Sequence, residues 1–233
     1  IRYENSVYNF EMLLFYEKWM RDLTDSQDKN GAIPDTAPYF FGSRPGTHIT
    51  SVFVLLPWLL YRFYGDRQII EEYYEHLKKY VLFKLSQRTS EGILPGNYIG
   101  DWAPPMTEAQ WGWGENAVPA NCPQSLFTTC YLLYDCMIME KISDTLGKAE
   151  DCGLFAQEAS MLNTAIQKNF YHPEKGYYGS GTQGCNLFPL FLGIVPKTEK
   201  DKVFQNLLYD ITVLHQNHIT TGNQMTKFLY EVL

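Results

Sequence analysis

The sequence predicts an all-α fold, a partial (α/α)6 toroid of stacked helical hairpins. Segments with helical patterns lie at 4–24, 49–63, 66–88, 123–146, 149–169, 183–192, 198–215 and 222–233. The connections between these segments alternate between long and short. Helices that are apolar all round also alternate with helices that carry a polar face, as an inner and an outer ring of helices would require.

The long connections, at 25–48, 89–122 and 170–182, contrast with short ones such as Gly147-Lys148. Because antiparallel hairpins turn at alternate ends, the long connections are expected on one face of the molecule. Loops carry most binding and catalytic residues, so any chemistry is expected on that face. A closed ring of six hairpins needs more helices than this chain has, so residues 1–233 are expected to form a single, incomplete domain.

The individual segments support this architecture. The first helix, 4–24, ends before the turn signal Asn30-Gly31. The segment 49–63 is apolar nearly all round, which predicts burial on every side. The segment 66–88 alternates acids and bases, so its outer face is expected in solvent. The same contrast recurs further along: 123–146 and 183–192 are apolar, whereas 149–169 and 198–215 are mixed.

Composition excludes several classes of protein. The chain is 45% hydrophobic and 19% charged, which is typical of a globular protein. A net charge of −7 with scattered basic residues argues against a nucleic-acid partner. The most apolar segment, 49–63, is too short for a membrane span and is interrupted by Pro57 and Arg62. No signal peptide is visible after Ile1.

No cofactor or metal is expected. The five cysteines lack metal-ligand spacing, and no His-x-x-x-His or Cys-x-x-Cys pattern occurs. No glycine-rich phosphate loop or dinucleotide fingerprint occurs either. Cys130 and Cys136 lie in an apolar helix and are expected in the core.

The longest connection combines carboxylates with tryptophans: Asp101, Trp102, Glu108, Trp111, Trp113 and Glu115. Indole rings stack on the apolar faces of sugars, and carboxylates bind hydroxyls or exchange protons, so this loop predicts a carbohydrate site. Structural interpretations stay open beside the functional one. Asp101 could equally cap a turn or a helix start, Trp111 and Trp113 could pack beneath the loop, and Glu108 and Glu115 fit an ordinary loop surface better than catalysis.

Two histidines also fall at connections. His48 precedes an apolar helix, where it would cap that helix or contact a ligand. His218 opens the stretch His218-Ile219-Thr220-Thr221-Gly222, which fits a helix cap or part of a site. The candidate substrate-binding residues are therefore Asp101, Trp102, Trp111, Trp113, Glu115, His48 and His218.

Several short motifs follow one another in a recognisable order: Lys18 to Leu23, Gly31 to Pro34, Pro57 to Tyr61, Gly100 to Trp102, Leu146 to Lys148, Gln183, and His218 to Gly222. Together they resemble the catalytic domain of bacterial α-L-rhamnosidases, inverting glycoside hydrolases of the six-hairpin type. The resemblance covers nearly the whole chain. It implies an (α/α)6 toroid and a carbohydrate partner, and it places Asp101 and Trp102 in the sugar pocket.

The resemblance also implies that the chemistry lies outside these residues. The family's general acid belongs to a segment before Ile1, and its general base to a segment after Leu233. This chain is therefore expected to be a segment of an enzyme that cleaves terminal α-L-rhamnosyl linkages with inversion, inactive alone and without catalytic residues of its own. At Thr47 to Thr50 the chain departs from the family, which has a Trp and an Asp-Ala pair there.

Other functions remain compatible with the sequence. The departure at Thr47 to Thr50 favours a non-catalytic carbohydrate-binding relative that retains the toroid. Another six-hairpin glycosidase or a polysaccharide lyase is a further alternative, and a lyase would use Arg44 and His48. Because an incomplete ring exposes the apolar faces of its inner helices, self-association of the chain is also expected.

Overall fold

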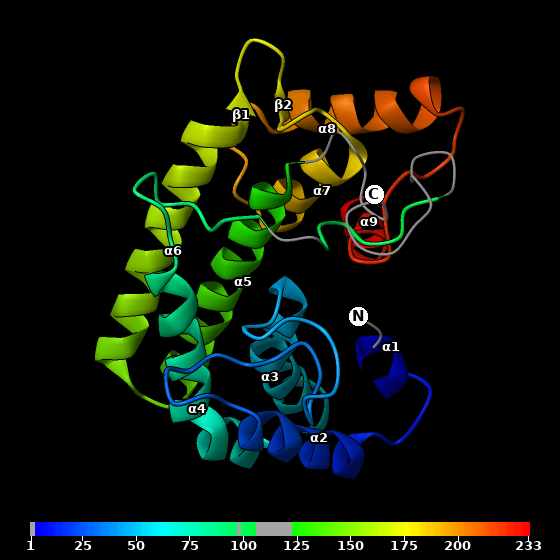
Figure 1. The fold of residues 1–233 in the computed structure, drawn as a ribbon. Helices are drawn as coiled ribbons and strands as arrows, with labels where there is room; N and C mark the ends of the chain where they lie inside the picture. The colour runs from blue at the N-terminus through cyan, green and yellow to red at the C-terminus, as the bar shows by residue number, and fades with distance from the viewer. Residues whose placement is uncertain (1–2, 97–98, 106–122) are drawn as a thin grey trace. The chain divides into compact units, whose positions relative to one another are not determined.

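The computed structural model describes residues 3–96, 99–105 and 123–233. The chain divides into two compact units: unit 1 comprises residues 1–88 and 131–161, and unit 2 comprises 89–130 and 162–233. Both units are built mainly from helices (Figure 1), which confirms the predicted all-α class.

The helices are α1 (Tyr3–Val7), α2 (Leu13–Asp25), α3 (Val52–Tyr64), α4 (Arg67–Ser86), α5 (Gln124–Thr145), α6 (Ala149–Phe170), α7 (Gln183–Phe191), α8 (Lys200–Tyr209) and α9 (Thr226–Val232). A 3-10 turn, His48–Ser51, leads into α3, and a π-helical turn, Asp210–Leu214, extends α8. Two short strands, β1 (Tyr171–His172) and β2 (Tyr177–Tyr178), pair antiparallel.

The short connections are made by residues that stop one helix and start the next. Gly65 has a left-handed backbone, with φ of 75°, at the end of α3. The Asp66 side chain then accepts hydrogen bonds from the N–H groups of Gln68 and Ile69 and so caps α4. Gly147 plays the terminating role between α5 and α6, with φ of 72°. The predicted helix ends next to these turns are confirmed to within one residue, whereas α3 begins three residues after the predicted residue 49.

The prediction of one continuous helix over 4–24 is wrong, because the helix is interrupted between α1 and α2. The backbone N–H groups of Asn9 and Phe10 both donate to the carbonyl of Ser6. The N–H of Met12 donates to the hydroxyl of Tyr64, at 3.1 Å. A side chain from α3 therefore stabilises the interruption between the two helices. The sequence has no glycine or proline at this point to indicate it.

A β-hairpin in unit 2, which the helical pattern did not predict, joins α6 to α7. The hairpin lies beside α8 (Figure 1). The Lys202 ammonium donates to the carbonyl of Pro173 at 2.6 Å, and the Asn206 amide donates to the carbonyl of Gly176 at 2.7 Å. These contacts satisfy carbonyl groups of the hairpin turn.

Each unit has its own apolar core. In unit 1 the α3 side chains Phe53 and Leu56 are fully buried, but Phe63 near the end of the helix is 44% exposed. The predicted burial of this helix on every side is therefore wrong at its last turn. In unit 2 Phe228 stacks on Phe188, with ring centroids 5.4 Å apart. Cys130 and Cys136 are buried, as predicted.

Membrane, metal and protein partners each require particular features of the described residues. None of their helices combines the length and the apolar composition needed to cross a bilayer. They contain no group of three or more His, Cys, Asp or Glu that could hold a metal ion. Large apolar side chains are exposed at Phe10, Leu14 and Phe40, but self-association stays a prediction.

Candidate functional site

The candidate site in unit 2 is organised around Asp101 and the turn that precedes α9. One carboxylate oxygen of Asp101 accepts a hydrogen bond from the N–H of Gly222 at 2.7 Å. The other accepts from the N–H of Met225 at 3.0 Å. These donors lie at the start of a helix, where backbone N–H groups lack partners within the helix itself. The contacts match the capping interpretation of Asp101, and they explain why α9 begins later than the predicted residue 222.

Trp102 is fixed to the same turn. Its carbonyl accepts a hydrogen bond from the N–H of Asn223 at 2.8 Å. A Cβ atom on Gly222 would overlap the carbonyl oxygens of Asp101 and Trp102 and would lie 2.7 Å from the carbonyl carbon of Asp101. The loop therefore approaches the turn closely at a position that only glycine can occupy. The Trp102 side chain is half-buried, so part of the indole stays accessible.

His218 belongs to the same turn as Gly222, and its position is set by Gln183, the first residue of α7. The Gln183 amide nitrogen donates to the carbonyl of His218 at 3.1 Å, and its amide oxygen accepts from the N–H of Thr220 at 2.9 Å. Three predicted site residues, Asp101, Trp102 and His218, are thus linked through one turn within unit 2.

The ionisation of Asp101 is unusual. Burial raises the pKa of its carboxyl from 3.8 to about 7, against the opposing effect of the backbone N–H groups of Gly222 and Met225. A raised pKa is typical of a general acid, but such an acid must also reach its substrate. Asp101 is only 1% exposed, and both of its oxygens are occupied by backbone donors. The position of Asp101 is therefore that of a structural residue, which holds its loop to the turn before α9.

Exchanging Asp101 for asparagine should change how stability depends on pH. Folded Asp101 keeps its proton up to about pH 7, whereas the unfolded carboxyl loses it near 3.8. This stabilisation is therefore complete below pH 3.8 and is lost as the pH rises through 7. We expect urea unfolding between pH 4 and 8 to show a fall in stability, at most about 1.4 kcal/mol per pH unit, that Asp101→Asn lacks. Parallel curves for the two proteins would contradict this account.

His48 lies in unit 1, in the 3-10 turn before α3. It is 2% exposed, and its ring stacks on Tyr131 of α5 with centroids 4.8 Å apart. One turn further along, the hydroxyl of Ser51 donates to the Asp135 carboxylate at 2.9 Å. The Lys84 ammonium donates to the same carboxylate oxygen at 2.7 Å and to the Ser51 hydroxyl at 3.1 Å. His48 thus shares its 3-10 turn with Ser51, a member of a buried ionic cluster.

The remaining predicted site residues, Trp111, Trp113 and Glu115, lie outside the described residues, as does Glu108. The sequence analysis did not single out four polar residues that form buried or half-buried polar contacts in the structure: Lys84, Asp135, Asp210 and His215. Asp135 did carry a signal, because a lone acid in an apolar helical stretch requires a buried partner. Gln183 was noted only through the family resemblance.

A family model described as the bacterial α-L-rhamnosidase six-hairpin glycosidase domain matches residues 2–233. The chain belongs to this family. The match confirms the predicted fold class, a partial (α/α)6 toroid, and makes the chain a segment of an α-L-rhamnosidase-like glycoside hydrolase. Within this six-hairpin glycosidase segment, the contact between Asp101 and Gly222 joins two of the motifs on which the resemblance rested.

Known α-L-rhamnosidases are similar to this six-hairpin glycosidase segment along its whole length. One from Formosa agariphila is 27% identical over 249 residues, which cover 99% of this chain and 25% of that protein. The structure of the enzyme from Dictyoglumus thermophilum is 31% identical, with a TM-score of 0.91, over 100% of this chain and 25% of that one. The enzyme from Streptomyces avermitilis, solved in complex with L-rhamnose, shares the fold at 22% identity and a TM-score of 0.79, over 99% of this chain and 21% of that one. The segment thus spans about a quarter of the length of these relatives.

Proposed function

We propose that this chain contributes a sugar-binding wall to an inverting hydrolase of terminal α-L-rhamnosyl linkages, whose general acid and base lie outside these residues. The observation that carries the proposal is the attachment of the Asp101-Trp102 loop to the turn at Gly222. It holds a half-buried indole and an exposed imidazole, that of His218, on one small scaffold. Stacking on an indole and hydrogen bonding to polar side chains are the usual means of holding a pyranose.

The carboxylates of this scaffold support a binding role over a catalytic one. Inverting hydrolysis needs two carboxyl groups with room for a water molecule between them and the sugar. Asp101 gives both oxygens to backbone N–H groups. Asp210 accepts hydrogen bonds from Gln183 and His215. Both side chains are buried, so neither is placed to protonate a leaving group or to activate water.

The test combines binding with turnover. The chain is titrated with L-rhamnose by NMR and is separately incubated with an aryl α-L-rhamnoside. We expect saturable binding of the sugar and no turnover of the glycoside. Trp102→Ala should weaken binding roughly fivefold, because an aromatic contact contributes about 1 kcal/mol. Trp19→Ala, which alters another half-buried indole in unit 1, should leave binding unchanged.

Two results would contradict the proposal. One is the absence of L-rhamnose binding by a folded chain. The other is glycoside turnover that Asp101→Asn abolishes, since this would require a working acid–base pair within the chain.

A second candidate function is that of a non-catalytic carbohydrate-binding relative. The observation that favours it is the burial of His48 against Tyr131, at a position where the family has a different pattern. Activity of the complete polypeptide that contains this segment distinguishes the two functions. The lyase alternative is less well supported, because Arg44 is ion-paired with Asp28 and lies over the ring of Tyr39.

A further inference from the structure

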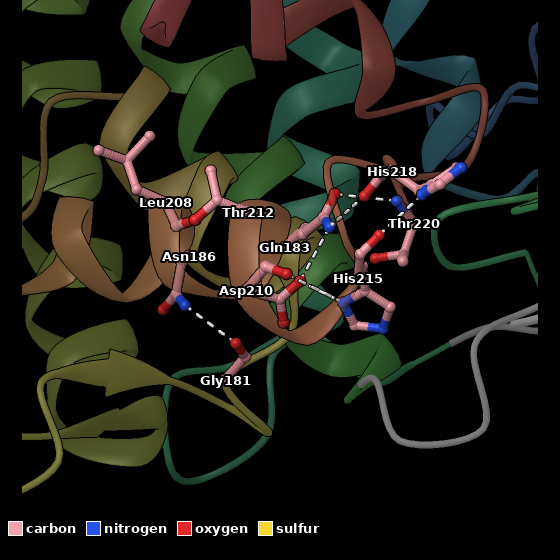
Figure 2. Close-up of polar contacts among 9 residues, drawn as sticks. All are labelled: Gly181, Gln183, Asn186, Leu208, Asp210, Thr212, His215, His218 and Thr220. Carbon is pink, nitrogen blue, oxygen red and sulfur yellow. Dashed lines mark hydrogen bonds and ion pairs between the residues drawn. The ribbon is translucent and has the colours of Figure 1, made fainter.

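A connected set of hydrogen bonds in unit 2 joins α7 and the end of α8 to the turn that carries His218 (Figure 2). Gln183 is at its centre and is fully buried. Its amide nitrogen faces two acceptors, the Asp210 carboxylate at 2.8 Å and the His218 carbonyl. Its amide oxygen faces a donor, the N–H of Thr220. Because amide nitrogens only donate and amide oxygens only accept, these partners fix the orientation of the amide.

Asp210 is the acceptor that joins Gln183 to His215 in this set of hydrogen bonds. Its side chain is 8% exposed, and one carboxylate oxygen accepts from Gln183 and from Nδ1 of His215, the latter at 2.8 Å. It also begins the π-helical turn that ends α8. Beyond that turn, Gln216 and Asn217 have left-handed backbones, with φ of 51° and 67°. Left-handed residues other than glycine persist where their surroundings hold them, and here the N–H of Asn217 donates to the carbonyl of Ile211 at 2.7 Å, while Gln183 binds the chain directly after them at His218 and Thr220.

The hydrogen-bond partner of the His218 ring defines its tautomer. Its Nδ1 lies 2.9 Å from the carbonyl oxygen of His215. A carbonyl can only accept, so Nδ1 carries the hydrogen, and in a neutral imidazole Nε2 is then an acceptor. His218 is exposed, and sugar hydroxyls are hydrogen-bond donors as well as acceptors.

We propose that Gln183 and Asp210 are positioning residues that hold His218 as its Nδ1–H tautomer, so that Nε2 accepts a hydrogen bond from a sugar hydroxyl. The inference rests on the proposed carbohydrate-binding function and adds the direction of one of its hydrogen bonds. It gives Gln183 and Asp210 a role in recognition although neither touches the ligand.

The first measurement requires no variant. Long-range proton–nitrogen NMR on the 233-residue chain, at a pH where the ring is neutral, reports which ring nitrogen of His218 carries the hydrogen. We expect Nδ1. A ring found mainly in its Nε2–H form would overturn the proposal.

Gln183→Met then tests the positioning role, since methionine keeps the size of the side chain and removes all three hydrogen bonds. We expect the His218 ring to move toward the Nε2–H tautomer and the Kd for L-rhamnose to rise roughly tenfold, which is the loss of one hydrogen bond. Gln183→Glu is the isosteric second variant. It retains an acceptor for Thr220 but turns a carboxylate oxygen toward Asp210, so the same two readouts should change.

Gln167→Met is the matched control. Gln167 is also a hydrogen-bonded glutamine of unit 2: its amide donates to the carbonyl of Ile194 at 2.9 Å and accepts from the Tyr178 hydroxyl at 2.8 Å. Its loss should lower stability and leave both the His218 tautomer and the Kd unchanged. Equal effects from the two methionine variants would reduce Gln183 to a structural role and overturn the inference.

The outcomes separate this inference from the proposed function. Absence of L-rhamnose binding by the unaltered chain contradicts the proposed function, while the tautomer still decides whether the turn is held as described. Binding that Gln183→Met and Gln183→Glu leave unchanged contradicts the inference alone.

Discussion

Replacing Lys84 with methionine is expected to lower the free energy of unfolding by about 3–5 kcal/mol. The Lys84 and Asp135 side chains are 9% and 0% exposed, and their charges are 2.7 Å apart. Burial is the largest single influence on the pKa of Lys84 and would lower it, but the charge of Asp135, the neighbouring Tyr80 and the hydrogen bonds to both together raise that pKa, so the ammonium stays charged. The other oxygen of Asp135 has no hydrogen-bond partner among the described residues. Removing Lys84 therefore leaves a buried carboxylate with only Ser51 to stabilise it.

Urea unfolding of the variants measures this effect. Lys79→Met, on the same helix but exposed, should change stability by less than about 0.5 kcal/mol. The double variant Lys84→Met with Asp135→Leu removes both charges and should recover most of the loss, since apolar pairs often replace buried ion pairs without penalty. A loss below about 1 kcal/mol for Lys84→Met would show that this pair does not hold unit 1 together.

Gly222→Ala should have an effect of similar size, about 3 kcal/mol or more. The added methyl group would overlap the carbonyl oxygens of Asp101 and Trp102, and backbone atoms cannot move aside as a flexible side chain would. Relieving the overlap separates the loop from the turn and removes hydrogen bonds to a buried carboxylate. We expect lower stability in urea, and faster hydrogen exchange at the N–H groups of Gly222 and Met225.

Gly153→Ala provides the control. Gly153 lies within α6, and a Cβ there would meet no atom within 4 Å. Alanine should therefore stabilise the helix by roughly 0.5–1 kcal/mol through its higher helix propensity. Gly222→Ala with wild-type stability and exchange would mean that the loop is not held against the turn as described.

Features that depend on neighbouring residues were predictable from the sequence. Gly65, Asp66 and Gly147 end and start helices through their own backbone and side-chain preferences, and the helix ends next to them were predicted within one residue. The interruption of the helix before α2 was not predictable in this way. It depends on the Tyr64 hydroxyl, which comes from another helix 52 residues away in sequence.

The same division holds within the candidate site. Asp101, Trp102 and His218 were identified from residue type, loop context and family resemblance, and one turn links them. The contacts that fix them are distant in sequence: Gln183 reaches the carbonyl of His218 across 35 residues, and Asp101 reaches the N–H of Gly222 across 121. No local pattern specifies such pairs. A single sequence shows only that a polar residue in an apolar helix needs a partner, without saying which one.

The contact between Asp101 and Gly222 spans 121 residues, which has a consequence for biosynthesis. At translation rates of about 5–20 residues per second, the Asp101 loop leaves the ribosome about 6–24 s before the turn that binds it. Helices such as α4 depend on local contacts and can form within that interval, while closure of so long a loop is delayed by its entropy. During this time the carboxylate is hydrated and ionised, so the contact between the Asp101 loop and the turn at Gly222 forms later than local structure such as α4.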